Sequence, residues 1–279
     1  MRDRDPGCPK PVLSGSNLDQ ISHDKTIFTS IFNPEKRFFH IGIIAKKDQA
    51  SIGKITDLIF ENGISSILNE NISTGEDRIS IRILGEGEKK LKTEDLKEAL
   101  QSSPFILEVK IIESKNGYLV DRLSFPVRFT NGEEAVLIKR KGLTSMINNL
   151  RESFGTGADV ILFKEGYFIG KTVAEGLLDK MGEQNLMKNI SDVLQLYSAV
   201  GWGRPELLHI DFQEMKFRIA IYDNFECLDK KSERANSHFT RGDVCGFFST
   251  IMKTELRCDE IKCVAKGDAS CDFLLTKPN

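Results

Sequence analysis

Apolar positions recur with a regular period across the first half of the chain. Ile52, Ile55 and Ile59 fall on one face of a helix, as a period of about 3.6 residues requires. Residues 79–83 alternate between isoleucine and polar residues, which is typical of a strand with one buried face. The pattern predicts a strand at 38–44, a helix between Asp48 and Gly63, strands at 64–72 and 78–84, a helix at 93–102 and a strand at 105–112. This β-α-β-β-α-β order is the ferredoxin-like split unit.

The second half of the chain mixes helical and strand patterns. Two strands joined by a turn are expected within residues 207–227, and a helix follows them at 240–255. Strands joined by a turn pair antiparallel, so an antiparallel sheet is expected. Helices layered on such a sheet imply a second α+β domain. We expect strands at 134–141 and within 207–227, an apolar run at 158–166, helices at 142–154, 168–181, 186–199 and 240–255, and a closing hairpin at 260–276.

A length of 279 residues favours two domains. The Pro-, Gly- and Ser-rich start of the chain predicts a disordered or extended lead. Turn signals such as "SKNG" and "TNGEE" predict a connector between the two folded parts. The expected division is a lead at 1–34, a ferredoxin-like domain at 35–115, a connector at 116–135 and a second domain at 136–279.

Composition narrows the classes of function. The formal net charge is -2, so no basic excess indicates direct binding of nucleic acid. We find no run of about 18 apolar residues, so no membrane span is expected. The start of the chain lacks the apolar core of a signal peptide, which predicts a cytoplasmic protein. Its six cysteines are then expected to be reduced, with metal-binding or core-packing roles.

The C-terminal hairpin carries the most informative cluster. Cys263 and Cys271 flank a Gly-Asp turn, so their sulfur atoms can converge, and Glu260 lies three residues before the first cysteine. Thiolates with a carboxylate suit Zn²⁺, which takes four ligands in a structural site. An alternative is that these cysteines are small buried hydrophobic residues. Candidates for the fourth ligand are His238, Cys227, Cys258 and Cys245, of which Cys245 has helical spacing typical of core packing.

Residues 238–273 resemble the signature of 4-vinyl-reductase-type domains. The string "HFTRGDVCGFF" is followed by E-x-x-C and then by KGD-x-x-C-x-F. The resemblance implies an α+β fold similar to TRAPP transport subunits, with an enclosed apolar cavity. It also implies zinc held by Glu260, Cys263 and Cys271 with an upstream cysteine. That cysteine would fall near Ser237, so His238, or Cys227 as a substitute, is expected to complete the site; the alternative is a site that is incomplete and empty. The matching residues are Gly242, Gly246, Glu260, Cys263, Gly267, Asp268, Cys271 and Phe273.

The first domain resembles ACT regulatory domains. The resemblance rests on "KD" at residues 47–48 and "FENGISSI" at residues 60–67, within the predicted element order. ACT domains usually carry glycine at the first turn, where an amino-acid effector binds, and this chain has Ala50 there. A role in dimerisation or packing alone is the alternative.

These features predict a regulatory or sensor protein that binds a small apolar or aromatic molecule, as a homodimer. The second domain is expected to hold the ligand in an apolar pocket. We find no dinucleotide-binding fingerprint, P-loop or nucleophile elbow, and we assign no catalytic residue. The alternatives are an enzyme or accessory protein of tetrapyrrole vinyl-group metabolism, and a non-catalytic interaction scaffold. The expected pocket residues are Phe163, Tyr167, Phe168, Trp202 and His209, with ordinary core packing as the alternative for each.

Overall fold

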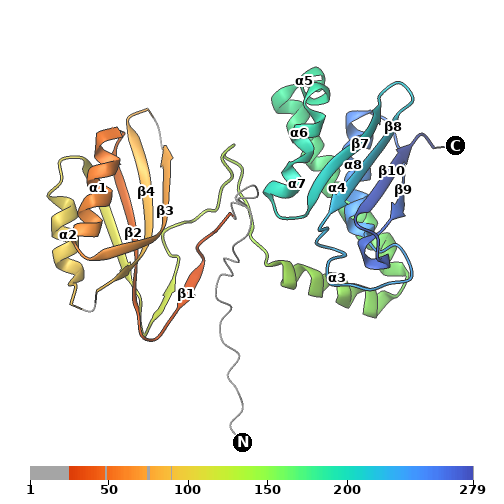
Figure 1. Ribbon diagram of the computed structural model, residues 1–279. Coiled ribbons are helices and arrows are strands. Elements are labelled where there is room, and N and C mark those ends of the chain that lie inside the picture. The colour runs from red at the N-terminus through yellow and green to blue at the C-terminus, as the bar shows by residue number, and fades with distance from the viewer. Residues whose placement is uncertain (1–24, 48, 74–75, 89, 279) are drawn as a thin grey trace, which may run out of the picture. The chain divides into compact units, whose positions relative to one another are not determined.

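The structure is a computed structural model that describes residues 25–278, apart from residues 48, 74–75 and 89 (Figure 1). Most of the predicted lead, including Cys8, therefore lies outside the described residues. The chain divides into two compact units between Ala135 and Val136. No helix among the described residues is long and apolar enough to cross a membrane.

Unit 1 contains a four-stranded antiparallel sheet with two helices on one face (Figure 1). Alternating isoleucines of the two central strands pack under these helices, together with Leu96 and Leu100. This arrangement confirms the ferredoxin-like order, whereas the likeness to ACT domains stays a prediction. The strand order is β3 (Ile64–Ser73), β4 (Arg78–Gly87), β2 (Arg37–Lys46) and β5 (Ile106–Glu113), and the helices are α1 (Gln49–Glu61) and α2 (Thr93–Gln101).

A second, two-stranded sheet belongs to the same unit. Strand β1 (Ser30–Phe32) pairs antiparallel with β6 (Tyr118–Val120). Leu119 of β6 forms a small buried cluster with Phe38 and Leu84 of the larger sheet. Segments expected to be part of a lead and a connector are therefore held in unit 1, because their apolar side chains complete its core.

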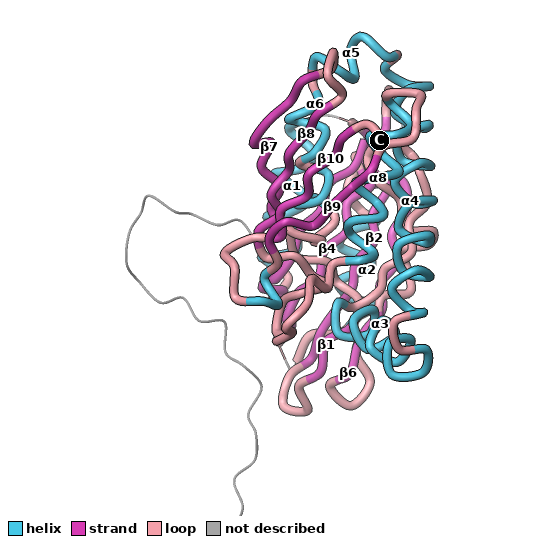
Figure 2. The backbone as a smooth tube through the Cα atoms, turned by 90° about the vertical axis from the view of Figure 1, so that its right-hand side faces the viewer, coloured by secondary structure: helices cyan, strands magenta, loops and turns pink. Residues whose placement is uncertain are grey.

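Unit 2 is an α+β domain built on an antiparallel sheet of four strands. Helix α8 is buried over nearly its whole length and lies between this sheet and α4 (Figure 2). The strand order is β7 (Arg204–Asp211), β8 (Lys216–Tyr222), β10 (Cys271–Thr276) and β9 (Arg257–Lys262). The helices are α3 (Arg140–Phe154), α4 (Gly157–Met181), α5 (Glu183–Lys188), α6 (Ile190–Leu194), α7 (Leu196–Ala199) and α8 (His238–Ile251), with a 3₁₀ turn at Val264–Lys266.

Three local expectations for the second half of the chain are wrong. Residues 134–141 form no strand, since their pairing with other described residues is limited to a single bridge between Glu134 and Arg128. The apolar run at 158–166 and the helix expected at 168–181 are one helix, α4. The helix expected at 186–199 is divided into three short helices, with breaks at Asn189 and Gln195.

Helices α4 and α8 touch backbone to backbone. A Cβ atom added to Gly246 would lie 2.0 Å from the carbonyl oxygen of Tyr167, and one added to Gly170 would lie 1.9 Å from that of Asp243. Gly166 and Gly242 have equally close approaches to the opposite helix. Small residues four apart let two helices approach this closely. The two helices therefore form a rigid pair that supports the sheet.

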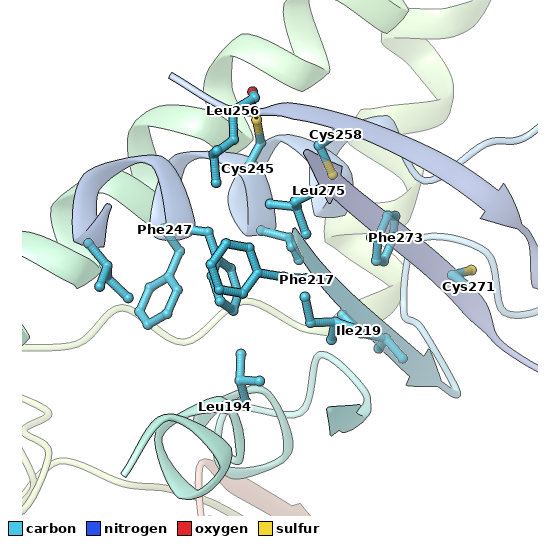
Figure 3. Packing of buried hydrophobic residues seen from close by; sticks show 14 of the residues in the cluster. Leu194, Phe217, Ile219, Cys245, Phe247, Leu256, Cys258, Cys271, Phe273 and Leu275 are labelled. Atoms are coloured by element: carbon cyan, nitrogen blue, oxygen red, sulfur yellow. Dashed lines mark hydrogen bonds between the residues drawn. The ribbon is translucent and has the colours of Figure 1, made fainter. Parts of the chain in front are cut away.

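The main core of unit 2 lies between α8 and the sheet (Figure 3). Phe217 of β8 packs on Phe248 of α8, with ring centroids 4.8 Å apart. Leu194 of α6 and Leu275 of β10 belong to the same cluster. Cys271 lies at one end of this core, where β10 begins.

Candidate metal centre

Four side chains converge at the end of the hairpin that closes unit 2. The ligand atoms of Cys227, Glu260, Cys263 and Cys271 all lie within 4.8 Å of one another. The sulfur atoms of Cys227 and Cys263 are 3.6 Å apart, which is too long for a disulfide bond. All three cysteines are fully buried, and Glu260 is partly buried. The arrangement can hold a small cation with soft and hard ligands together.

The hairpin itself positions two of these cysteines. Cys263 follows β9, Cys271 begins β10, and the connection passes through a 3₁₀ turn. Gly267 ends this turn with a φ of 102°, a conformation that glycine adopts without strain. The Asp268 carboxylate accepts a hydrogen bond of 2.8 Å from the Cys263 amide, and the amide of Val264 points at the Cys271 sulfur at 3.4 Å. The Gly-Asp turn therefore aims both sulfur atoms inward.

Cys227 reaches the hairpin from the loop after β8. Its sulfur also lies 3.1 Å from the hydroxyl oxygen of Ser237, the residue that precedes α8. The Ser237 hydroxyl donates a hydrogen bond of 2.6 Å to one Glu260 oxygen, and its amide donates one of 3.0 Å to the other. Ser237 thus occupies the position where the resemblance implies a cysteine, and Cys227 lies beside it.

Neighbouring groups shift the proton affinities within the cluster. A hydrogen bond with Cys227 lowers the pKa of Cys263, and the same contact raises the pKa of Cys227. Burial raises the pKa of Glu260 to about 8. Three thiols and a carboxyl this close cannot all ionise unless a cation offsets their charge. Thiolate ligands must lose their protons when a metal binds, so the cluster could hold a cation only with its thiols deprotonated.

His238 lies outside this cluster. Its Nε2 atom is 3.3 Å from an Asp159 oxygen, and its Nδ1 atom is 3.3 Å from the Arg241 guanidinium. Burial lowers the pKa of His238. Of His238 and Cys227, the structure brings Cys227 to the group and leaves His238 beside Asp159 and Arg241.

Two further cysteines belong to the hydrophobic core. Cys245 of α8 and Cys258 of β9 lie among buried apolar residues (Figure 3). The Cys245 thiol donates to the carbonyl oxygen of Leu256 at 3.2 Å. They serve as small buried hydrophobic residues.

The expected pocket residues are spread over three places. Trp202 packs against Phe225 and Phe239, with ring centroids 5.5 and 5.6 Å apart. Phe163 and Tyr167 are partly buried neighbours on α4. Phe168 is 58% exposed on the outer side of α4, and His209 is exposed on β7. Trp202, Phe163 and Tyr167 therefore lie in or against the core, and the other two face solvent.

The sequence interpretation missed a buried polar pair beside Trp202. Tyr197 packs edge-on to Trp202 and donates a hydrogen bond to the Asp243 carboxylate in the middle of α8. Burial raises the pKa of Asp243 to about 7. Among the described residues Tyr197 is the one donor to this carboxylate. The signal in the sequence is an aspartate among the small and apolar residues at 242–248.

A buried ion pair anchors the start of α8. Glu226 is fully buried, and its carboxylate accepts hydrogen bonds from the amides of Phe239 and Thr240. Arg151 of α3 lies 2.7 Å from Glu226 and also donates to the carbonyl oxygen of Asn236. A carboxylate at a helix N-terminus satisfies amides that have no partner within the helix. Helix α8 is therefore fixed at its first turn.

These features define an α+β domain in which a cysteine-rich hairpin closes a sheet beside a buried helix. Residues 217–277 match the V4R domain family. The matched stretch contains α8 and all four residues of the cluster. The resemblance to 4-vinyl-reductase-type domains is thereby confirmed.

One curated protein is similar to part of this chain at low identity. An uncharacterized protein of Methanocaldococcus jannaschii, MJ0150, is 25% identical over 122 residues, which cover 43% of this chain and 66% of that protein. The matched part of this chain thus spans slightly less than two thirds of that relative.

Three solved structures are similar to part of this chain. The phenol-responsive sensory domain of the transcription activator PoxR with phenol is 16% identical, with 53% of this chain and 79% of that chain covered and a TM-score of 0.45. Trafficking protein particle complex subunit 3 from Naegleria fowleri, covalently bound to palmitic acid, is 12% identical, with 50% of this chain and 93% of that chain covered and a TM-score of 0.39. A vinyl-4-reductase family protein from Methanocaldococcus jannaschii is 18% identical, with 53% of this chain and 100% of that chain covered and a TM-score of 0.33.

Proposed function

We propose that unit 2 is a small-molecule sensor domain held together by a structural zinc ion. The observation that carries the metal part is the convergence of three buried cysteines and one glutamate within 4.8 Å. Zn²⁺ takes thiolate and carboxylate ligands, with four in a closed structural site. No further protein ligand is needed.

The spacing of the sulfur atoms agrees with zinc. A Zn–S bond of about 2.3 Å in a tetrahedral site puts two sulfur atoms about 3.8 Å apart. The Cys227 and Cys263 sulfurs are 3.6 Å apart, so these two side chains are already spaced as a pair of zinc ligands. Cys227, Glu260, Cys263 and Cys271 would hold the ion, which would supply cross-linking of the loop after β8 to the hairpin.

Elemental analysis of the purified full chain tests the metal. We expect about one zinc per chain for the wild type and close to none for Cys271→Ala. Cys258→Ala is the matched control, since it removes another buried thiol, one outside the cluster, and should keep its zinc. Absence of zinc from the wild type, even after zinc is added, would refute the metal site, as would equal zinc in Cys271→Ala.

The sensor part of the proposal rests on the V4R domain and on the surroundings of Trp202. Aromatic rings meet a buried carboxylate there, and few polar groups in an apolar setting are typical of small-molecule sites. An ionised carboxylate can accept about four hydrogen bonds, and Tyr197 supplies one to Asp243. A small aromatic compound with a hydroxyl group would fit this chemistry.

Titration with phenol tests the sensor part. Trp202 is the single tryptophan of the chain, so its fluorescence reports this region directly. We expect a saturable change in its emission, which Asp243→Ala weakens and which Cys258→Ala leaves intact. A response that does not saturate, or an equal response in Asp243→Ala, would refute a site beside Trp202 without affecting the metal proposal.

A further inference from the structure

Ser237 binds both oxygens of Glu260. It is fully buried, and it donates 2.6 Å from its hydroxyl to Oε1 and 3.0 Å from its amide to Oε2. Two donors on one residue fix the plane and the direction of the carboxylate. The direction of Glu260 toward the cysteines is therefore set by a residue outside the ligand group.

The same serine touches a second member of the cluster. Its hydroxyl oxygen lies 3.1 Å from the sulfur of Cys227. Since the single hydroxyl proton points at Glu260, this oxygen is left to accept the proton of the Cys227 thiol in the metal-free site. Ser237 thus contacts two of the four candidate ligands, Cys227 and Glu260, without being a ligand itself. Such outer partners of metal ligands orient them and tune the affinity of the site.

Ser237 is also the residue from which α8 starts. Its carbonyl oxygen accepts a hydrogen bond of 2.7 Å from the amide of Arg241, which closes the first turn. The next amides, of Phe239 and Thr240, are bound by Glu226. The start of α8 is therefore held by two carboxylates, and one of them belongs to the candidate metal site.

We infer that Ser237 is a positioning residue for the metal centre and couples its occupancy to the first turn of α8. The inference rests on the metal site proposed above. Ser237 orients Glu260 toward the cation through its hydroxyl and its amide. Cys227, a ligand by its convergence with the other three side chains, also touches Ser237 through its sulfur. Any movement of Glu260 on loss of the cation is passed to α8 through these two hydrogen bonds.

The affinity for Zn²⁺ alone, measured by competition with a chromophoric chelator, tests the positioning role. We expect Ser237→Ala to bind one zinc at saturation, but about 10- to 100-fold more weakly than the wild type. Ser249→Ala is the matched control, because Ser249 is a buried serine of α8 whose hydroxyl binds the Leu256 amide, away from the cluster. It should leave the zinc affinity unchanged.

The outcomes separate this inference from the metal proposal. A wild type that binds no zinc overturns both. A wild type that binds zinc with the same affinity as Ser237→Ala overturns the positioning role alone. An equal loss in Ser249→Ala also overturns it, because general destabilisation of α8 would then explain the effect. Emission of Trp202 verifies that each variant is folded.

An exchange of ligands tests the role of Cys227. The Cys227→Ser variant should lose zinc, whereas Cys227→Ser combined with Ser237→Cys should bind one zinc again, since the two side-chain atoms are 3.1 Å apart. Cobalt substitution should give sulfur-to-metal charge-transfer absorption of similar strength in the wild type and the double variant. Full zinc binding by Cys227→Ser alone would overturn the assignment of Cys227.

Hydrogen exchange tests the coupling to α8. Removal of zinc from the wild type should accelerate exchange of the amides in the first turn of α8. The acceleration should be smaller in Ser237→Ala, which lacks one of the two hydrogen bonds to Glu260. An equal acceleration in both proteins would show that Ser237 does not transmit metal occupancy.

Discussion

The substitution Asp243→Asn should change how the stability of unit 2 depends on pH. Asp243 is buried, and its pKa in the folded protein is raised to about 7. In the unfolded chain its pKa returns to about 3.9. Because the folded pKa is the higher one, stability is greatest below the unfolded value and is lost as the pH rises through the folded value. Asparagine does not ionise, so the variant lacks this loss.

The size of the effect follows from the two pKa values. A difference of about three pKa units corresponds to about 4 kcal/mol in the free energy of unfolding. Roughly 2.5 kcal/mol of this falls between about pH 5 and about pH 8, because ionisation of the unfolded chain has already begun at the lower pH. The wild type should therefore lose about 2.5 kcal/mol relative to Asp243→Asn over this interval.

Urea unfolding followed by tryptophan fluorescence measures this difference. Trp202 is adjacent to Tyr197 and reports on unit 2 alone. Both proteins should be saturated with zinc, so that other titrating groups cancel in the comparison. Parallel curves of unfolding free energy against pH for the two proteins would refute the raised pKa of Asp243. Tyr197→Phe removes the hydrogen bond that lowers the pKa of Asp243 and should steepen the loss.

Two further substitutions test the packing of α4 on α8 and the ion pair at the start of α8. Gly246→Ala should cost about 3 kcal/mol in a urea titration, because its Cβ would lie 2.0 Å from the Tyr167 carbonyl oxygen. Gly176→Ala, on the same helix pair but with no atom within 4 Å, should instead stabilise by about 0.5–1 kcal/mol, and equal losses would contradict the close packing. Arg151→Met should cost about 3 kcal/mol, since it leaves Glu226 buried without its cation. A loss below about 0.5 kcal/mol would show that the backbone amides alone support Glu226.

The sequence predicts the elements with a strong local period and misses those that depend on distant partners. The alternating isoleucines of β4 and the apolar face of α1 carry their own periodicity, so the order of unit 1 follows from them. Residues 134–141 have the composition of a strand, but a strand also needs a neighbour to pair with, and composition does not provide one. Strands β1 and β6 are short, and their pairing joins segments almost 90 residues apart.

The residues of the candidate site also divide into those that local spacing predicts and those that distant packing brings in. Glu260, Cys263 and Cys271 belong to one hairpin, so their convergence follows from local spacing. Cys227 approaches from a separate loop, and its position depends on how that loop packs against the start of α8. The pairing of Tyr197 with Asp243 likewise depends on the packing of α7 beside α8, which no local pattern encodes. Sequence reasoning therefore recovers the hairpin part of the site.

The place of Cys227 in the chain gives a bound cation one more effect. Cys227 and Cys263 are 36 residues apart, and the whole of α8 lies between them. A cation shared by both cysteines closes this segment into a loop even when its helix has melted. By the chain-entropy estimate used for disulfides, a cross-link around a loop of that length disfavours the unfolded chain by about 4 kcal/mol. The metal centre would thus act as a reversible cross-link around α8, and chelation would remove it.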